Sequence, residues 1–262
     1  MTIKLIVLFL APLLAGLLIY LVPKGRNTNY KLLLVFAGSY LFAITITHIL
    51  PELYQHAEIR FIGIFVLVGF FLQQVLEYFT SGVEHGHLHG HAHHHGDHHD
   101  HAHAHAHDHT HHGHRMSAFV LLVALCLHAF LEGAMLAQPA EGGGVYNVTA
   151  VLLGVVLHRT PAAFALMTVL VFQLGSTRKA IPYLLVFSLA APVGLLLSNY
   201  LSASEVLTRN GLIYLYALVC GSFLQISTTI VFESSPEHGL NPKKLLVAGA
   251  GAAAAVTLEM VV

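Results

Sequence analysis

Charged residues are scarce in this sequence. Asp, Glu, Lys and Arg together make up only 10% of its 262 residues, whereas a soluble globular domain typically carries roughly 25%. Hydrophobic residues account for 56%. So little charge excludes an ordinary soluble domain, and the composition predicts an integral membrane protein that crosses the bilayer several times.

Cysteines are few and enzyme motifs are missing. The two cysteines, Cys126 and Cys220, fall within apolar stretches, which indicates buried apolar side chains and gives no information about the redox compartment. The sequence contains no His-Glu-x-x-His protease motif and no nucleotide-binding motif. We therefore expect this chain to be no enzyme, to use no catalytic cofactor, to hydrolyse no ATP and to bind no nucleic acid.

The apolar residues form stretches long enough to cross a bilayer, which takes about 20 residues. Lys4 precedes the first stretch as in a signal peptide, but no small-residue cleavage site follows, so we count it as a span. The sequence predicts an all-α polytopic membrane protein, a single domain over residues 1–262, with eight transmembrane helices. Their expected ranges are residues 5–22, 32–53, 61–79, 119–137, 148–172, 181–201, 212–232 and 245–262.

Lysine and arginine are distributed unequally between the loops. The loops after the odd-numbered spans contain Lys24, Arg26, Lys31, Arg115, Arg178, Lys179, Lys243 and Lys244, whereas the opposite side has only Lys4, Arg60 and Arg209. By the positive-inside rule, the more basic side faces the cytosol. The sequence therefore predicts that both termini face outward, in the plasma membrane or a bacterial inner membrane.

Two segments five spans apart are similar. GSYL at residues 38–41 and Pro51-Glu52 bracket much of the second span, as GSFL at residues 221–224 and Pro236-Glu237 do in the seventh. An odd number of spans separates them, so they run in opposite directions through the membrane, as in an inverted repeat. Spans one to three would then correspond to spans six to eight around a central pair, where such transporters place the substrate site.

Residues 81–115 form a polar loop between the third and fourth spans that is rich in histidine. Imidazole suits Zn, Cu, Fe and Ni, and His-rich tracts are typical of metal binding. A flexible linker is compatible with this role, and a purification tag is disfavoured because the tract is internal and irregular. We expect a cytosolic loop that is disordered without metal and binds ions weakly through His85, His87, His89, His91, His93, His94, His95, His98, His99, His101, His103, His105, His107, His109, His111, His112 and His114.

The central spans contain ionisable residues at helical spacing. His128 and Glu132 in the fourth span are four residues apart, so they share one helix face, and His158 lies in the fifth. A single intramembrane histidine is more often a packing residue. A His-x-x-x-Glu pair is harder to explain as a packing feature, because ionisable groups are costly within a membrane. The pair predicts half of a metal site.

The second span has a similar pair, His48 and Glu52. Pro51 cannot donate to the carbonyl of Thr47, and Pro161 cannot donate to that of Leu157. Each freed oxygen immediately precedes a histidine and would add a ligand, although a simple packing kink is the alternative. His48 and Glu52 are either a waystation on a metal pathway or ordinary interfacial residues.

At these motifs the chain resembles the ZIP family of divalent metal transporters. The resemblance covers all eight spans and rests on HAFLEG at residues 128–133 and HRTP at 158–161, with HILPE, APVG and GSFL as lesser matches. It implies transport of Zn, Fe, Mn or sometimes Cd toward the cytosol, with the metal held between spans four and five by His128, Glu132 and His158. It also implies a cytosolic histidine loop that senses or buffers metal.

The chain departs from the family pattern at Ala129, Arg159 and Ala162. Two-metal relatives have polar or acidic residues there, so the resemblance implies a mononuclear site. An arginine in a span must face a partner or water. We expect the Arg159 guanidinium to stand in for a second cation beside Glu132, with Glu233 as a rival partner and a hydrated vestibule as the alternative.

The sequence thus predicts a divalent cation transporter, most readily for zinc, with iron, manganese or cadmium as alternative substrates. A metal exporter or nickel/cobalt permease and a non-transporting metal receptor are the rival functions. The expected partners are divalent metal ions and the lipid bilayer, and a homodimer stays open.

Overall fold

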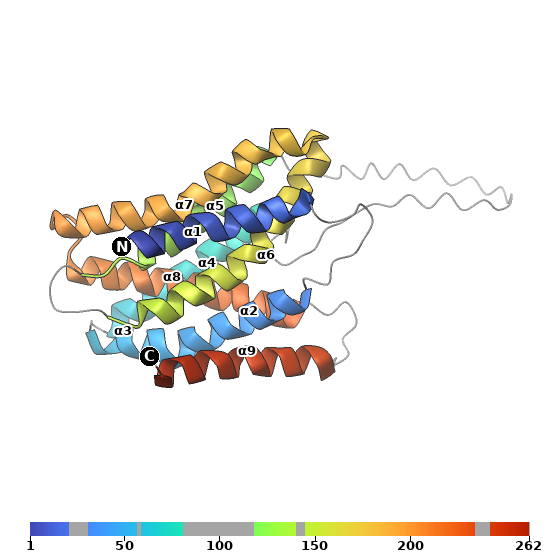
Figure 1. The fold of residues 1–262 in the computed structure, drawn as a ribbon. Coiled ribbons are helices and arrows are strands. Elements are labelled where there is room, and N and C mark those ends of the chain that lie inside the picture. The colour runs from blue at the N-terminus through green and yellow to red at the C-terminus, as the bar shows by residue number, and fades with distance from the viewer. Residues whose placement is uncertain (21–30, 57–58, 81–117, 140–144, 234–241, 262) are drawn as a thin grey trace, which may run out of the picture.

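The computed structural model describes residues 1–20, 31–56, 59–80, 118–139, 145–233 and 242–261, and this part of the chain is a bundle of helices (Figure 1). The predicted loop at 81–115 and the Pro236-Glu237 pair lie outside the described residues. The helices are α1 (Thr2–Leu17), extended by a 3₁₀ turn (Leu18–Tyr20), α2 (Lys31–Ile44), α3 (Leu50–His56), α4 (Ile59–Thr80), α5 (Ala118–Met135), α6 (Val148–Leu174), α7 (Thr177–Ala203), α8 (Arg209–Glu233) and α9 (Pro242–Val261).

Helical structure covers most of each of the eight predicted stretches, so the all-helical prediction is confirmed. Six helical segments are long and apolar enough to cross a membrane, and α5 contributes a shorter apolar helix, Phe119–Met135. The six are Thr2–Tyr20, Leu32–Gln55, Arg60–Phe79, Val148–Leu174, Thr177–Ala203 and Arg209–Val231. The described N-terminal residues and the end of α9 lie at the same end of the bundle (Figure 1).

The two prolines predicted to free a carbonyl have different local effects. A π-helical turn, Thr45–Ile49, joins α2 to α3 directly before Pro51, because a widened turn accommodates the missing donor. In contrast, α6 runs through Pro161 as one helix. The Thr160 hydroxyl there donates to the carbonyl of Val156 at 2.7 Å.

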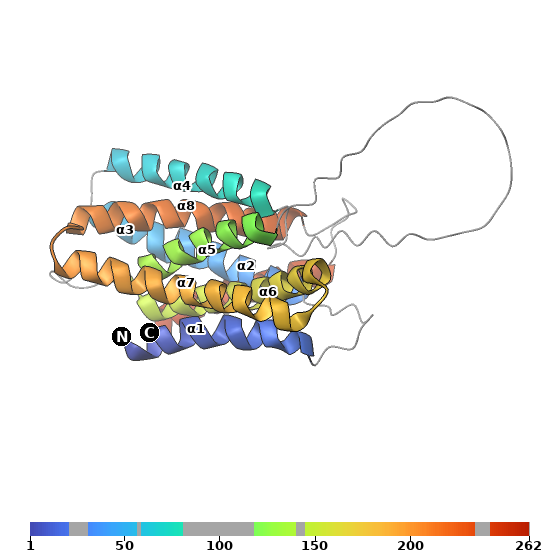
Figure 2. The ribbon, with the colours of Figure 1, turned by 90° about the horizontal axis from the view of Figure 1, so that it is seen from above.

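The helices pack in four main pairs, α4 with α8, α5 with α7, α2 with α9, and α1 with α6 (Figures 1 and 2). Glycines allow the closest approaches. Gly69 of α4 and Gly221 of α8 each lie against the partner helix backbone, and so do Gly133 of α5 and Gly194 of α7. Such contacts are typical of membrane helices, where packing rather than water exclusion holds helices together.

Gly133→Ala is expected to destabilise the bundle, because the added Cβ would collide with the backbone carbonyl of Ala191 in α7. Overpacking of this kind typically costs about 1–3 kcal/mol. Gly249→Ala on α9 is the matched control, since its Cβ meets nothing within 4 Å among the described residues. Thermal unfolding of both purified variants should show a lower Tm for Gly133→Ala alone, and equal Tm values would contradict the close α5–α7 packing.

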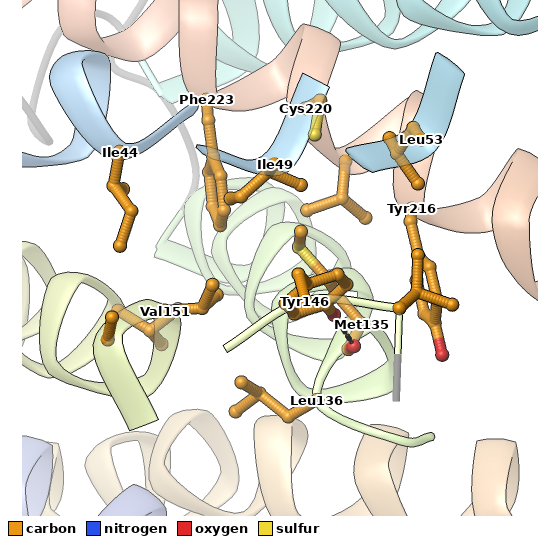
Figure 3. Close-up of a cluster of buried hydrophobic side chains, with 14 of the residues drawn as sticks. Ile44, Ile49, Leu53, Met135, Leu136, Tyr146, Val151, Tyr216, Cys220 and Phe223 are labelled. Carbon is orange, nitrogen blue, oxygen red and sulfur yellow. Dashed lines mark hydrogen bonds between the residues drawn. The ribbon is translucent and has the colours of Figure 1, made fainter. Parts of the chain in front are cut away.

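A large apolar cluster fills the bundle where α5 ends and α6 begins (Figure 3). Tyr146 and Tyr216 pack edge to face within it, with ring centroids 5.1 Å apart. Their hydroxyls donate to the carbonyls of Met135 and Ala137, respectively. The cluster therefore ties the end of α5 to α8.

Candidate metal centre

Three ionisable side chains converge in the middle of the bundle. His128 and Glu132 come from α5 and His158 from α6. The Nε2 atoms of His128 and His158 lie 2.8 Å and 2.5 Å from Glu132 Oε1. One candidate ligand atom from each residue lies within 4.8 Å of the others. Glu132 is fully buried, and both imidazoles are 5% exposed.

A backbone contact assigns the protons on His158. Its Nδ1 lies 3.0 Å from the carbonyl oxygen of Gly154, and because a carbonyl only accepts, Nδ1 must carry the proton. In the neutral ring the lone pair of Nε2 then faces the Glu132 carboxylate. Two acceptors this close repel each other unless a cation lies between them, and a histidine fixed through its other nitrogen is typical of metal ligands.

Arg159 lies beside this cluster. Its Nε is 3.8 Å from Glu132 Oε2, and one Nη donates to the carbonyl of Phe187 in α7 at 3.1 Å. The guanidinium carbon lies 4.9 Å from the centre of the Phe187 ring. Arg159 is only 2% exposed. The structure thus brings Arg159 next to Glu132, while the side chain of the rival partner, Glu233, lies outside the described part.

A small cavity adjoins the cluster, with room for about one water molecule. Its polar lining consists of His128, His158 and Arg159. No acidic side chain of the described residues is among those that line it. The remaining lining residues are Leu34, Leu125, Ala162, Phe187, Ile226 and Ile230.

The second predicted pair is arranged differently. His48 Nδ1 lies 3.2 Å from Glu259 Oε1 of α9, and His48 Nε2 accepts a hydrogen bond from the backbone N–H of Asn147 at 2.9 Å. The Thr47 hydroxyl also lies 3.1 Å from Glu259. Both nitrogens of His48 are therefore engaged in joining α2, α6 and α9. Glu52 forms no metal-sized group of three with it among the described residues.

Sequence reasoning missed Glu259. It is the only acidic residue in the stretch 245–262, and an ionisable group within an apolar span is a signal that could have found it. The apolar residues that line the cavity carry no comparable signal, since they resemble lipid-facing residues until the helices are packed. The seventeen loop histidines lie outside the described residues.

Comparison with known proteins agrees with the motifs. A family model described as ZIP Zinc transporter matches residues 1–259. The chain is 33% identical over 124 residues to the zinc transporter ZIP9 of Macaca fascicularis, and this aligned region makes up 45% of this chain and 50% of that protein. It is 32% identical over 130 residues to ZIP9 of Xenopus tropicalis, covering 47% and 41%. The chain thus matches about half the length of these curated relatives or less.

Proposed function

The chain belongs to the ZIP zinc transporter family, and from this premise we propose that it carries a divalent cation, most readily zinc, toward the cytosol. The observation that carries the proposal is the convergence of His128, Glu132 and His158 with a lone pair of His158 directed at the carboxylate. Two imidazoles and one carboxylate, with water or another small ligand in the fourth position, suit tetrahedral zinc. Iron, manganese or cadmium remain alternative substrates, because affinity order alone does not set selectivity.

The site binds one ion at a time. Ala129 and Ala162 supply no ligand atom where a second metal would need one, and the guanidinium of Arg159 lies within 3.8 Å of Glu132. A positive charge at this distance disfavours a second cation. This supports the mononuclear site and the role of Arg159 as a fixed counter-ion of Glu132.

Eight membrane-spanning segments form an inverted repeat in this proposal, with α2 and α3 making one span. The repeat pairs α1 with α7, α2–α3 with α8, α4 with α9, and α5 with α6. Under this exchange the α4–α8 contact becomes the α9–α2 contact, and the α5–α7 contact becomes the α6–α1 contact. All four are the main packing pairs of the bundle, which supports the two-fold relation and a substrate site on the central helices.

In alternating access, the site opens to one side of the membrane while the other side is closed, and then the reverse. The apolar cluster around Tyr146 and Tyr216 lies where α5 ends and α6 begins, and α6 begins at the end of the bundle that contains the described N-terminal residues (Figure 1). The cavity extends the other way, since Leu125 precedes His128 in α5 and Ala162 follows His158 in α6. The uneven distribution of Lys and Arg supports a cytosolic location for that second side. The histidine tract there would buffer or sense the ion.

Metal uptake by proteoliposomes tests the function. We expect the purified chain to let zinc enter vesicles faster than protein-free vesicles do, with iron, manganese and cadmium compared at equal free concentration. Net flux only in the opposite direction, with insertion determined by protease accessibility, would favour the exporter. Saturable zinc binding without flux in either direction would favour a metal receptor.

A further inference from the structure

Helix packing divides the bundle into two groups. The main pairs α4 with α8 and α2 with α9, linked by contacts of α2 with α8, form the α2 group, to which α3 belongs as the extension of α2. The pairs α5 with α7 and α1 with α6, linked by contacts of α7 with α1 and α6, form the α5 group, which contains all three proposed metal ligands. The proposed two-fold relation maps each group onto itself. Since alternating access moves one helical unit against another, contacts between the two groups control which side is open.

Three side chains of the α2 group bind the backbone that connects α5 to α6. The Tyr216 hydroxyl of α8 donates to the carbonyl of Ala137, just after α5. The Tyr40 hydroxyl of α2 donates to the carbonyl of Ala150, in the first turn of α6, at 3.0 Å. His48 Nε2 accepts from the backbone N–H of the residue that precedes α6, at 2.9 Å. Both tyrosines are buried, so these three ties join the two groups at the end of the bundle where α6 begins (Figure 1).

Glu259 orients His48 within its tie. A backbone N–H only donates, so Nε2 of His48 carries a lone pair, and in the neutral ring the proton lies on Nδ1. Nδ1 then donates to Glu259 Oε1 at 3.2 Å, and the Thr47 hydroxyl lies 3.1 Å from the same carboxylate. His48 also belongs to the π-helical turn Thr45–Ile49, and such turns are frequent at functional sites. Glu259 is therefore a positioning residue that acts through His48.

The proposed repeat does not reproduce the ties on the other side of the metal site. The shift that aligns GSYL at residues 38–41 with GSFL at 221–224 gives the counterparts of Tyr40, His48 and Tyr216 as Phe223, Val231 and Leu33, respectively. None of these three counterparts can form a side-chain hydrogen bond. At the cavity, the α2 group contributes only Leu34, Ile226 and Ile230 to the described lining, and these three pack together as a buried apolar cluster. The two sides of the site therefore differ in sequence where the repeat makes them equivalent in topology.

We propose that Tyr40, His48 and Tyr216 form a gate, which holds the two groups together where α6 begins and releases the connection between α5 and α6 when the metal site opens to that side. This inference rests on the proposed transport function. Buried hydrogen bonds are costly to break unless water replaces them, so the ties favour the state that is closed on that side. In the proposed orientation that side is external.

Distances between spin labels on the two groups test the gate without requiring transport. The labels are attached at Gln55 of α3 and Ser204 after α7, which are both exposed, in the full chain with Cys126 and Cys220 replaced by alanine. Combining Tyr40→Phe with Tyr216→Phe removes only two hydroxyls. The ratio of the longer-distance to the shorter-distance population should rise by at least about fivefold, the low end expected for two hydrogen bonds.

The matched control combines Tyr20→Phe with Tyr78→Phe, which removes one exposed hydroxyl from each group. This double variant should leave the distances unchanged. His48→Gln should keep its tie, because an amide can accept from the N–H and donate to Glu259, whereas His48→Leu should shift the distances as the tyrosine variant does. Such rescue distinguishes the gate from a general loss of packing.

Zinc uptake by the same variants gives a second measurement. Apparent affinity scales with the fraction of binding-competent protein, so the KM for external zinc should fall as the open population rises. Unchanged distances in the Tyr40 and Tyr216 double variant would overturn the gate, and so would an equal shift in the control. If the double variant does not fold, the comparison of His48→Gln with His48→Leu decides. Shifted distances without zinc uptake by any variant or the wild-type chain would instead refute the transport function.

Discussion

His158→Ala is expected to reduce zinc uptake by about 100-fold or more at equal surface expression. The substitution removes one of the three proposed protein ligands while the contact between Arg159 and Glu132 remains. Even the loss of a group that only orients a metal ligand typically costs 10–100-fold in affinity or activity. Losing the ligand itself should cost at least the upper end of that range. Radioactive zinc uptake over a range of zinc concentrations measures the effect.

His48→Ala is the matched control, because His48 is also a partly buried histidine of an apolar helix but lies in the separate cluster with Glu259. It should retain far more uptake than His158→Ala. His128→Ala and Glu132→Ala should also lose uptake. Glu132→Ala should in addition lose stability by about 3–5 kcal/mol, because it leaves the Arg159 charge buried and unpaired. Wild-type uptake by all three ligand variants would refute the metal site.

Local patterns predicted the helices and half of the candidate site. Continuous apolar stretches set the approximate helix ranges, and the four-residue spacing of His128 and Glu132 placed them on one face of α5. The meeting of this pair with His158 depends on how α5 packs beside α6, which spacing within one helix does not determine. Its expectation therefore came from the resemblance to the family, and the structure brings the three residues together.

Contacts between distant segments were not predictable from the sequence. Glu259 reaches Thr47 across 212 residues, and His48 is bound to the backbone of Asn147 at the start of α6. Both contacts depend on the packing of α2 against α9 and α6. The carbonyl of Phe187 that accepts from Arg159 gives no sequence signal either, because every residue offers the same backbone acceptor. The π-helical turn before Pro51 likewise is one of several ways to absorb a missing donor.

Deleting residues 84–114 and joining the ends with a short flexible linker is expected to separate metal buffering from transport. The full chain should bind several zinc ions, whereas the deleted chain should bind one. Seventeen imidazoles in the tract account for the difference, since imidazole is a good ligand for zinc. Equilibrium dialysis followed by metal analysis gives the number of bound ions, and the same preparations give the uptake rate.

The uptake rate at saturating zinc should stay near that of the full chain, because all three proposed ligands and the residues lining the cavity belong to helices outside the tract. The pH dependence of binding adds an independent check. Free imidazole has a pKa near ~6.5, and it must be neutral to bind metal. Binding of the additional ions should therefore weaken below about pH 6 in the full chain. Loss of uptake at equal surface expression would place the tract on the transport route, and an unchanged number of bound ions would exclude it as the buffer.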